Sequence, residues 1–363
     1  MGMHTDLVAG DTATLRPWNV PRGLSDDRST AQPSEEVRQR YIRDILRLHG
    51  RQSFGRLDAE LRRTDACLYR SDHGRGVVTS VARSESIPER YLVGLAGFRL
   101  SEYLRAGFAC EDVVFNRSLF CEPVREFHPA DLHVITTDVA SGRILGYVAL
   151  AHSKDPEPRP LNATDRHPFP CEQAHDVRLQ NLLRDAGDLT THEVREVKRF
   201  VHAHAVTDRS LRLRITLELL AALTRASHLE GCLTRLLIGD VEEHVALRHL
   251  VLLGLDVRLL EGTEPRLNRQ NVMHPMYTAR AKVLPFYAWT PAAEEVDRRG
   301  RMLEQAAAAE SPFRALRELM SQLSGSVQYT EAERRARQAA PDRGEEAARE
   351  EAAGDAATGK AAA

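Results

Sequence analysis

Residues 192–214 read "HEVREVKRFVHAHAVTDRSLRLR", and this stretch decides the fold. Its first part alternates apolar and polar residues with the two-residue period of a β-strand, which predicts a strand near 194–206. Asp208 then precedes a segment with helical spacing at 209–229, and aspartate is one of the preferred residues at a helix N-cap. A strand that runs directly into a capped helix is typical of an α/β sheet.

The segments around this junction extend the same sheet. The runs 132–138 and 143–151 alternate around the turn "VASG" and predict a β-hairpin. After the quoted strand and helix we expect a strand, a helix and a strand at 232–239, 241–253 and 256–262. The middle one of these is expected to begin with a cap formed by Asp240 and Glu243. With a further helix at 87–108 covering the sheet, the fold class is predicted to be α/β (α+β).

The composition changes toward both ends of the chain. The N-terminal residues mix Gly, Pro, Asp and Ser without periodicity, and the C-terminal residues hold almost nothing that packs in a core. We therefore expect a disordered arm, one α/β domain with an N-terminal helical extension that starts at Ser34, surface helices, and a disordered tail. Their ranges are 1–33, 34–300, 301–325 and 326–363.

Charge and cysteine usage exclude several classes of protein. The formal net charge is −2, which gives no global field for nucleic acid or an anionic membrane. No signal-peptide core and no apolar run of membrane-spanning length is present, so we expect a soluble, cytoplasmic protein. The five cysteines are scattered without a CxxC motif, which is typical of reduced thiols.

The quoted strand carries charge where a core is expected. Strict alternation places Arg199 on an apolar face and Glu196, Phe200 and His202 on the other face. A buried arginine needs a carboxylate partner or a ligand, because an unpaired buried charge is costly. Glu196 joins it only if a β-bulge re-aims the side chains, and bulges are frequent beside active sites. The alternative is that Glu196, Lys198 and Arg199 form ordinary cross-strand ion pairs.

The junction after the strand has the features of an anion site. The helix that Asp208 caps presents free backbone N–H groups and the positive end of its dipole, which suits a phosphate. Arg209, Arg212 and Arg214 add positive charge around it. The alternative is a solvated first helical turn. No glycine-rich loop is present, so the junction is neither a Walker motif nor a dinucleotide fingerprint.

Neither metal chemistry nor covalent catalysis is expected. His202 and His204 share a strand face at a spacing that zinc uses, but apart from His192 the sequence offers no third ligand. Cys171 has no orienting partner in sequence, and no GxSxG motif is present.

Five segments, in this order, are similar to motifs of one group of enzymes. They read "FRLSEYLRAGFACED", "SGRILGYVALA", "HPFPCEQ", "EVKRFVH" and "LRHLVLLGLDVRLLEGTEPR". The group comprises the acyl-homoserine-lactone (autoinducer) synthases, the exosortase-associated acyltransferases and the N-acyl amino acid synthases. The similarity covers roughly residues 87–270. It implies the GNAT-like acyltransferase fold, a twisted mixed sheet that splays open between two central strands.

The resemblance also implies roles for particular residues. Glu196 matches the base that takes a proton from the acceptor amine, and Arg199 matches the arginine that supports it. The residues that match substrate-binding positions are Arg99, Tyr103, Phe108, Phe200 and His202. The splayed strands would hold the pantetheine arm of an acyl-CoA or an acyl carrier protein, which is the co-substrate, and no permanently bound cofactor is implied. Its phosphate would lie at Asp208, Arg209, Arg212 and Arg214, and these arginines would dock an acidic acyl carrier protein.

The chain departs from the autoinducer synthases at the positions that bind S-adenosylmethionine there. Ala149 stands in place of an arginine, and Glu111, Asp112 and Asp131 are loose counterparts of an acidic pair. We therefore expect another small amine acceptor, such as an amino acid. The acetyl-CoA signature is also absent, which favours a longer acyl donor. The alternatives are a conventional GNAT acetyltransferase and a GNAT-like module that binds without catalysing.

Overall fold

The computed structural model describes residues 35–183, 186–229, 233–242, 247–278, 283–323 and 325–331. Among these residues, nine strands form one mixed sheet in the order β1-β2-β3-β4-β5-β6-β8-β7-β9. The strands are β1 (Tyr69–Asp72), β2 (Val77–Arg83), β3 (Leu132–Asp138), β4 (Ile144–Ala151), β5 (Val194–His202), β6 (Leu236–Glu242), β7 (Asp256–Glu261), β8 (Val283–Trp289) and β9 (Ser326–Glu331). The helices are α1 (Glu35–Gly50), α2 (Leu57–Arg63), α3 (Glu89–Arg105), α4 (Glu111–Asn116), α5 (Pro170–His175), α6 (Arg209–Ala226), α7 (Leu247–Leu252), α8 (His274–Thr278), α9 (Ala293–Ala308) and α10 (Pro312–Gln322).

A parallel strand pair lies in the middle of the sheet. β5 and β6 are parallel, and α6 connects them, because two parallel neighbours need a crossover connection. The N-terminus of α6 is capped as the sequence predicts: the Asp208 side chain accepts a hydrogen bond of 2.7 Å from the Leu211 amide. The flanking strands from β1 to β4 form an antiparallel meander.

The sheet opens between these two central strands. β5 pairs with β6 only as far as Val197 and Gly239. Beyond that point β5 stays with β4, and β6 stays with β8. Gly239 has a φ of 155°, and a Cβ atom there would lie 2.9 Å from the Val197 carbonyl oxygen. The mixed α/β sheet, divided between two central strands, confirms the fold class predicted from the sequence.

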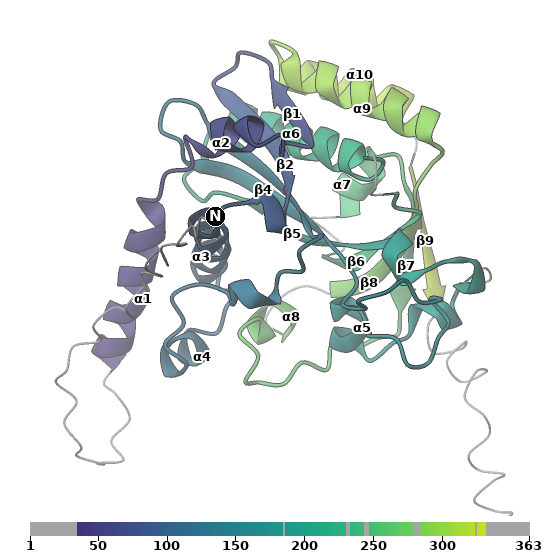
Figure 1. The fold of residues 1–363 in the computed structure, drawn as a ribbon, viewed down its shortest axis with the longest axis horizontal. Helices are drawn as coiled ribbons and strands as arrows, with labels where there is room; N and C mark the ends of the chain where they lie inside the picture. The colour runs from purple at the N-terminus through teal and green to yellow at the C-terminus, as the bar shows by residue number, and fades with distance from the viewer. Residues whose placement is uncertain are drawn as a thin grey trace, which may run out of the picture.

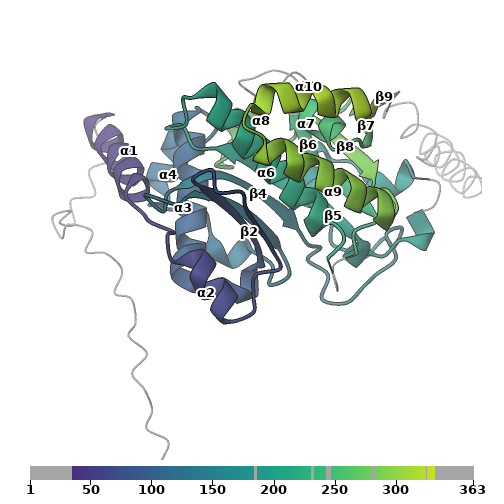
Figure 2. The same ribbon diagram turned by 90° about the horizontal axis from the view of Figure 1, so that it is seen from above.

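Helices cover both faces of the sheet. α6 packs on β3 and β4, with α9 and α10 lying over it (Figure 2). The approach to β4 is close, because a Cβ atom at Gly146 would meet the Ile215 side chain at 2.5 Å. Figure 1 shows α3, α5 and α8 on the opposite side from α6 and α9. No helix of the described ranges is both long and apolar enough to cross a bilayer.

Several predicted elements are confirmed and others need correction. The hairpin, the helix that begins near residue 87, and the strand and helix at the quoted junction all form. The predicted cap at Asp240 is wrong, because β6 continues through this residue to Glu242 and pairs there with β8. β1, β2 and β8 were not predicted from the sequence.

The C-terminal boundary also differs from the expectation. Residues 326–331, assigned to the tail, form β9 and pair in parallel with β7. The N-terminal arm, the Ser34 cap, Cys232 and residues 332–363 lie outside the described residues.

Candidate functional site

β5 contains a β-bulge at Arg199. Ala149 pairs with Lys198 but Tyr147 pairs with Val201, so three steps along β5 face two steps along β4. Arg199 takes up the extra residue with a left-handed φ of 64°. A bulge of this kind shifts the side-chain alternation by one position.

The bulge brings the predicted catalytic residues to one place. Glu196, Lys198 and Arg199 all line the same cavity, at the point where β5 and β6 separate. Beyond the bulge, His202 contacts Thr216 of α6, with 2.9 Å between Nε2 and Oγ1. The strict alternation assumed for the sequence, which placed His202 on the face of Glu196, is therefore wrong after Arg199.

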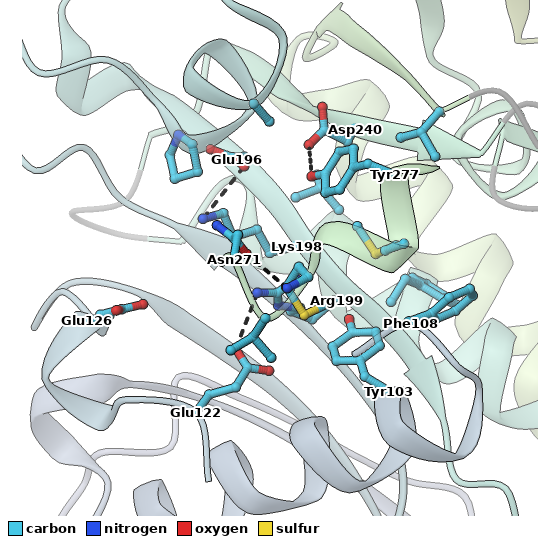
Figure 3. A pocket seen from close by; sticks show the side chains of 18 of the residues that line it. Tyr103, Phe108, Glu122, Glu126, Glu196, Lys198, Arg199, Asp240, Asn271 and Tyr277 are labelled. Carbon is cyan, nitrogen blue, oxygen red and sulfur yellow. Dashed lines mark hydrogen bonds and ion pairs between the residues drawn. The ribbon is translucent and has the colours of Figure 1, made fainter. Parts of the chain in front are cut away.

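The cavity has a volume of about 730 Å³ and lies between the two separated strands. Figure 3 shows its polar side chains, which come from β5, β6, α3, α8 and intervening loops. Much of the remaining wall is apolar and is formed by Leu100, Leu119, Leu220, Leu223, Val241, Leu250, Leu253, Val272, Met273, Met276, Val283 and Phe286. A cleft with a charged wall and an apolar wall suits a ligand that is polar at one end and apolar at the other.

Glu196 is a buried carboxylate in this wall. Its exposed fraction is 3%, and burial raises its pKa to about 7. The Lys198 ammonium, 3.6 Å from Oε1, acts in the opposite direction, and the Asp240 carboxylate raises the pKa further. A carboxylate with a pKa near 7 is matched to proton transfer at neutral pH.

Arg199 belongs to a buried cluster with more positive than negative charge. The Glu122 carboxylate accepts a hydrogen bond of 3.2 Å from Arg199 and two from Arg99, the shorter of 2.5 Å. Burial acts to raise the pKa of Glu122, but the two guanidinium groups outweigh it and lower the pKa. The Arg199 guanidinium also lies over the Tyr103 ring, 5.2 Å from its centroid. One carboxylate thus serves two guanidinium groups.

A second group of polar side chains lies across the split from Glu196. The Tyr277 hydroxyl donates a hydrogen bond of 2.5 Å to Asp240 Oδ2. His175 Nε2 lies 3.1 Å from Asp240 Oδ1, and the His175 side chain is fully buried. Burial, followed by the Asp240 carboxylate, raises the pKa of Tyr277.

The "HPFPCEQ" segment forms a wall of the cavity and is held by a buried ion pair. Arg166 donates to both oxygens of Glu172, at 2.7 and 2.6 Å, and both side chains are fully buried. Glu172 also accepts hydrogen bonds from the backbone amides of Phe169 and Leu179. This pair therefore fixes the turn that presents Pro170 to the cavity.

The other predicted substrate-binding residues are placed differently from one another. Tyr103, Phe108 and Phe200 line the main cavity, and Phe200 stacks on His249 with a centroid distance of 4.8 Å. Arg99 lines an adjoining cavity of about 80 Å³. His202 lines neither of these two cavities.

The four residues of the predicted phosphate site lie away from the two cavities, and one of them is used in packing. Asp208, Arg209 and Arg212 line neither cavity. Arg214 is buried and donates hydrogen bonds to the carbonyl oxygens of Ala307 and Ala309 at the C-terminal end of α9. The expectation that Arg214 binds a phosphate is therefore wrong, because its donors are used to attach α6 to α9.

Several polar residues of the site were not predicted from the sequence, and three of them contact or face Arg199 or Glu196. Glu122, Asp240 and Tyr277 come from a loop, a strand and a short helix that are far apart in the chain. No local spacing relates them to Glu196. Asp240 is a carboxylate at the end of an apolar run, which is a recognisable pattern in the sequence. This pattern predicted a helix cap instead of a site residue.

Comparisons with known proteins give weak matches. No protein-family model matches the sequence, and no curated protein is similar to it. Among solved structures, the AHL synthase LasI is 12% identical, with a TM-score of 0.38 over 65% of this chain and 95% of that chain. BjaI, described as a CoA-dependent acyl-homoserine lactone synthase with SAM and isopentyl-CoA, is 15% identical, with a TM-score of 0.35 over 69% and 92%. A GCN5-related N-acetyltransferase from Brucella melitensis is 11% identical, with a TM-score of 0.34 over 70% and 94%. Structures with TM-scores this low do not support a function for this chain. The proposed function is therefore argued from the strand order and the cavity.

Proposed function

We propose that the chain is an N-acyltransferase that moves an acyl group from a thioester to the amine of a small molecule such as an amino acid. The observation that carries the proposal is Glu196, a buried carboxylate with a pKa of about 7 beside a split in the sheet. An amine attacks a thioester only after it has lost a proton, and a well-placed base accelerates such a step by about 10²–10⁴-fold.

The split supplies binding groups for the acyl donor. After Val197 and Gly239 the facing edges of β5 and β6 no longer pair with each other. The main-chain groups on these edges can hydrogen-bond the amides of a pantetheine arm, which CoA and acyl carrier protein share. The apolar wall formed by α6, α7 and β8 suits a long acyl chain better than an acetyl group.

The junction of the two cavities supplies binding groups for the acceptor. Three cations, Lys154, Lys198 and Arg199, and two carboxylates, Glu122 and Glu126, line both cavities. The Lys154 ammonium forms no ion pair with any residue of the described ranges. Together with the excess positive charge around Arg199, these groups favour an acceptor that carries a carboxylate. We infer that its amine points toward Glu196.

The proposal is tested by supplying both substrates directly. Purified protein is incubated with acetyl-CoA, long-chain acyl-CoA or long-chain acyl carrier protein, together with a mixture of amino acids and simple amines. Mass spectrometry then searches for N-acyl products. We expect N-acyl products from the wild type with a long-chain donor and none from Glu196→Gln.

The same experiment separates the alternatives. Consumption of acetyl-CoA alone would identify a conventional acetyltransferase. Absence of product with every donor and amine, despite saturable binding of the thioester, would contradict catalysis and identify a binding module.

A further inference from the structure

The region around Asp240 contains buried polar atoms that the fold does not satisfy. Glu196 Oε2, Asp240 Oδ1 and both ring nitrogens of His175 have no hydrogen-bond partner among the residues that the structure describes. His175 Nε2 is close to Asp240, but its geometry is not that of a hydrogen bond. Buried polar atoms are normally paired, so such a group indicates a place where a ligand or a solvent molecule binds.

Two carboxylates of this group face the same cleft from different strands. Glu196 pairs with Ile238 across β5 and β6, and Asp240 is two residues further along β6. Side chains two residues apart in a strand lie on the same face, so both carboxylates point to the side of α5 and α8. Both line the main cavity (Figure 3), and the Asp240 carboxylate acts on Glu196 by raising its pKa.

We propose that the acceptor amine binds as an ammonium ion between Glu196 and Asp240, and that each carboxylate takes one of the two protons that the nitrogen loses. The proposal rests on the proposed function. Tyr277 is a positioning residue, because its hydroxyl donates a hydrogen bond to Asp240 Oδ2 and holds this carboxylate toward the cleft.

The chemistry requires two proton acceptors. The ammonium first gives a proton to Glu196, and the freed lone pair forms the C–N bond to the thioester carbon. The C–S bond then breaks, and the sulfur leaves with the electron pair. The nitrogen, positively charged after attack, gives its second proton to Asp240, which passes it to the departing thiolate. The products are an amide, a thiol and protonated Glu196, which releases its proton to solvent.

The unpartnered oxygens of the two carboxylates, Glu196 Oε2 and Asp240 Oδ1, support this position for the ammonium. The groups that face the carboxylate pair are Lys198 and Arg199 of β5, Cys171 and His175 of α5, and Tyr277 of α8. Lys198 reaches only Oε1 of Glu196, at 3.6 Å, which leaves Oε2 for a ligand. Two close carboxylates repel each other when both are ionised, and a cation between them offsets this repulsion.

The test follows the titration of Glu196 without any substrate. Infrared spectra recorded across pH give the band of protonated carboxylic acids, and subtraction of the Glu196→Gln spectra assigns the part due to Glu196. We expect a midpoint near 7 in the wild type and a lower midpoint in Asp240→Asn, because a neighbouring negative charge has been removed. Glu242→Gln, which removes another carboxylate of β6 that lines the cavity, is the matched control and should leave the midpoint unchanged.

Kinetics then test the proton transfer itself. With an amine found as acceptor, Asp240→Asn should lower kcat by about 10²-fold with a smaller effect on KM, and Asp240→Glu should recover part of the loss. An unchanged midpoint in Asp240→Asn would overturn the carboxylate pair, whatever the activity. A lowered midpoint with full kcat would overturn the role of Asp240 in catalysis. Absence of any product from the wild type would overturn the proposed function and leave the electrostatic pairing supported by the titration.

Discussion

Glu196 differs from a surface glutamate because its buried environment disfavours the ionised form of its side chain. Burial raises its pKa to about 7, so its carboxylate is half ionised at neutral pH. The proposed role of Glu196 as a base requires its ionised form, and the activity is therefore expected to increase with pH through a midpoint near 7. A pH profile of kcat/KM measures this increase in activity with pH. A profile that is flat between pH 5 and pH 9 would contradict the role of Glu196 as base.

The same burial has a consequence for stability. A carboxyl group whose pKa is higher in the folded state than in the unfolded state loses stability as pH rises from about 4.5 to about 7. Glu196→Gln should therefore gain up to about 3 kcal/mol in unfolding free energy, relative to the wild type, between pH 4 and pH 8. Urea denaturation at both pH values measures the difference, with Glu242→Gln as control. A constant difference between variant and wild type would show that Glu196 titrates normally.

At the scale of single residues, the sequence predicted Glu196 and Arg199 as site residues but did not predict the residues that contact them. Glu196 and Arg199 are close in the chain, and the motif contains both. Glu122, which pairs with Arg199, is 77 residues away from it in the chain. Only the folded backbone brings such residues together, so no spacing rule finds them.

At the scale of elements, a buried ion pair with surrounding hydrogen bonds holds the segment around Arg166 and Glu172. Arg166→Met leaves the Glu172 carboxylate buried without its partner, which costs about 3–5 kcal/mol. The double variant Arg166→Met/Glu172→Gln removes both charges and should recover part of this loss. Thermal or urea denaturation of the single and double variants completes the cycle. Equal destabilisation by the two variants would mean that an unpaired charge is not the cause.

The bulge explains how far the element pattern could be predicted. Alternation of residue types in the sequence identified β5, β3 and β4, although the structure buries most residues of β3 and β4 on both faces. It failed beyond Arg199, since one extra residue reverses the faces and no feature of the sequence marks where a bulge occurs. β8 was not predicted for two reasons. Its sequence "VLPFYAW" is buried on both faces and therefore lacks alternation, and it contains a proline.

At the scale of the whole molecule, the C-terminal strand is the edge strand of the sheet and covers β7. β9 pairs along all of β7, and an unpaired strand edge favours aggregation. A chain that ends at residue 325 should therefore unfold at a lower temperature and aggregate more readily than a chain that ends at residue 331. Calorimetry and light scattering compare the two. Identical behaviour of the two chains would mean that β9 contributes nothing to the sheet.

The order in which the strands pair bears on how the protein forms at the ribosome. β8 lies between β6 and β7, although both precede it in the chain. During synthesis, β6 and β7 therefore emerge without the neighbour that joins them. The edges of β6 and β7 that pair with β8 stay open until residues 283–289 have left the exit tunnel. The wall of the cleft that carries Asp240 is thus completed late in translation, after every residue of the main cavity has been made except those of β8 itself.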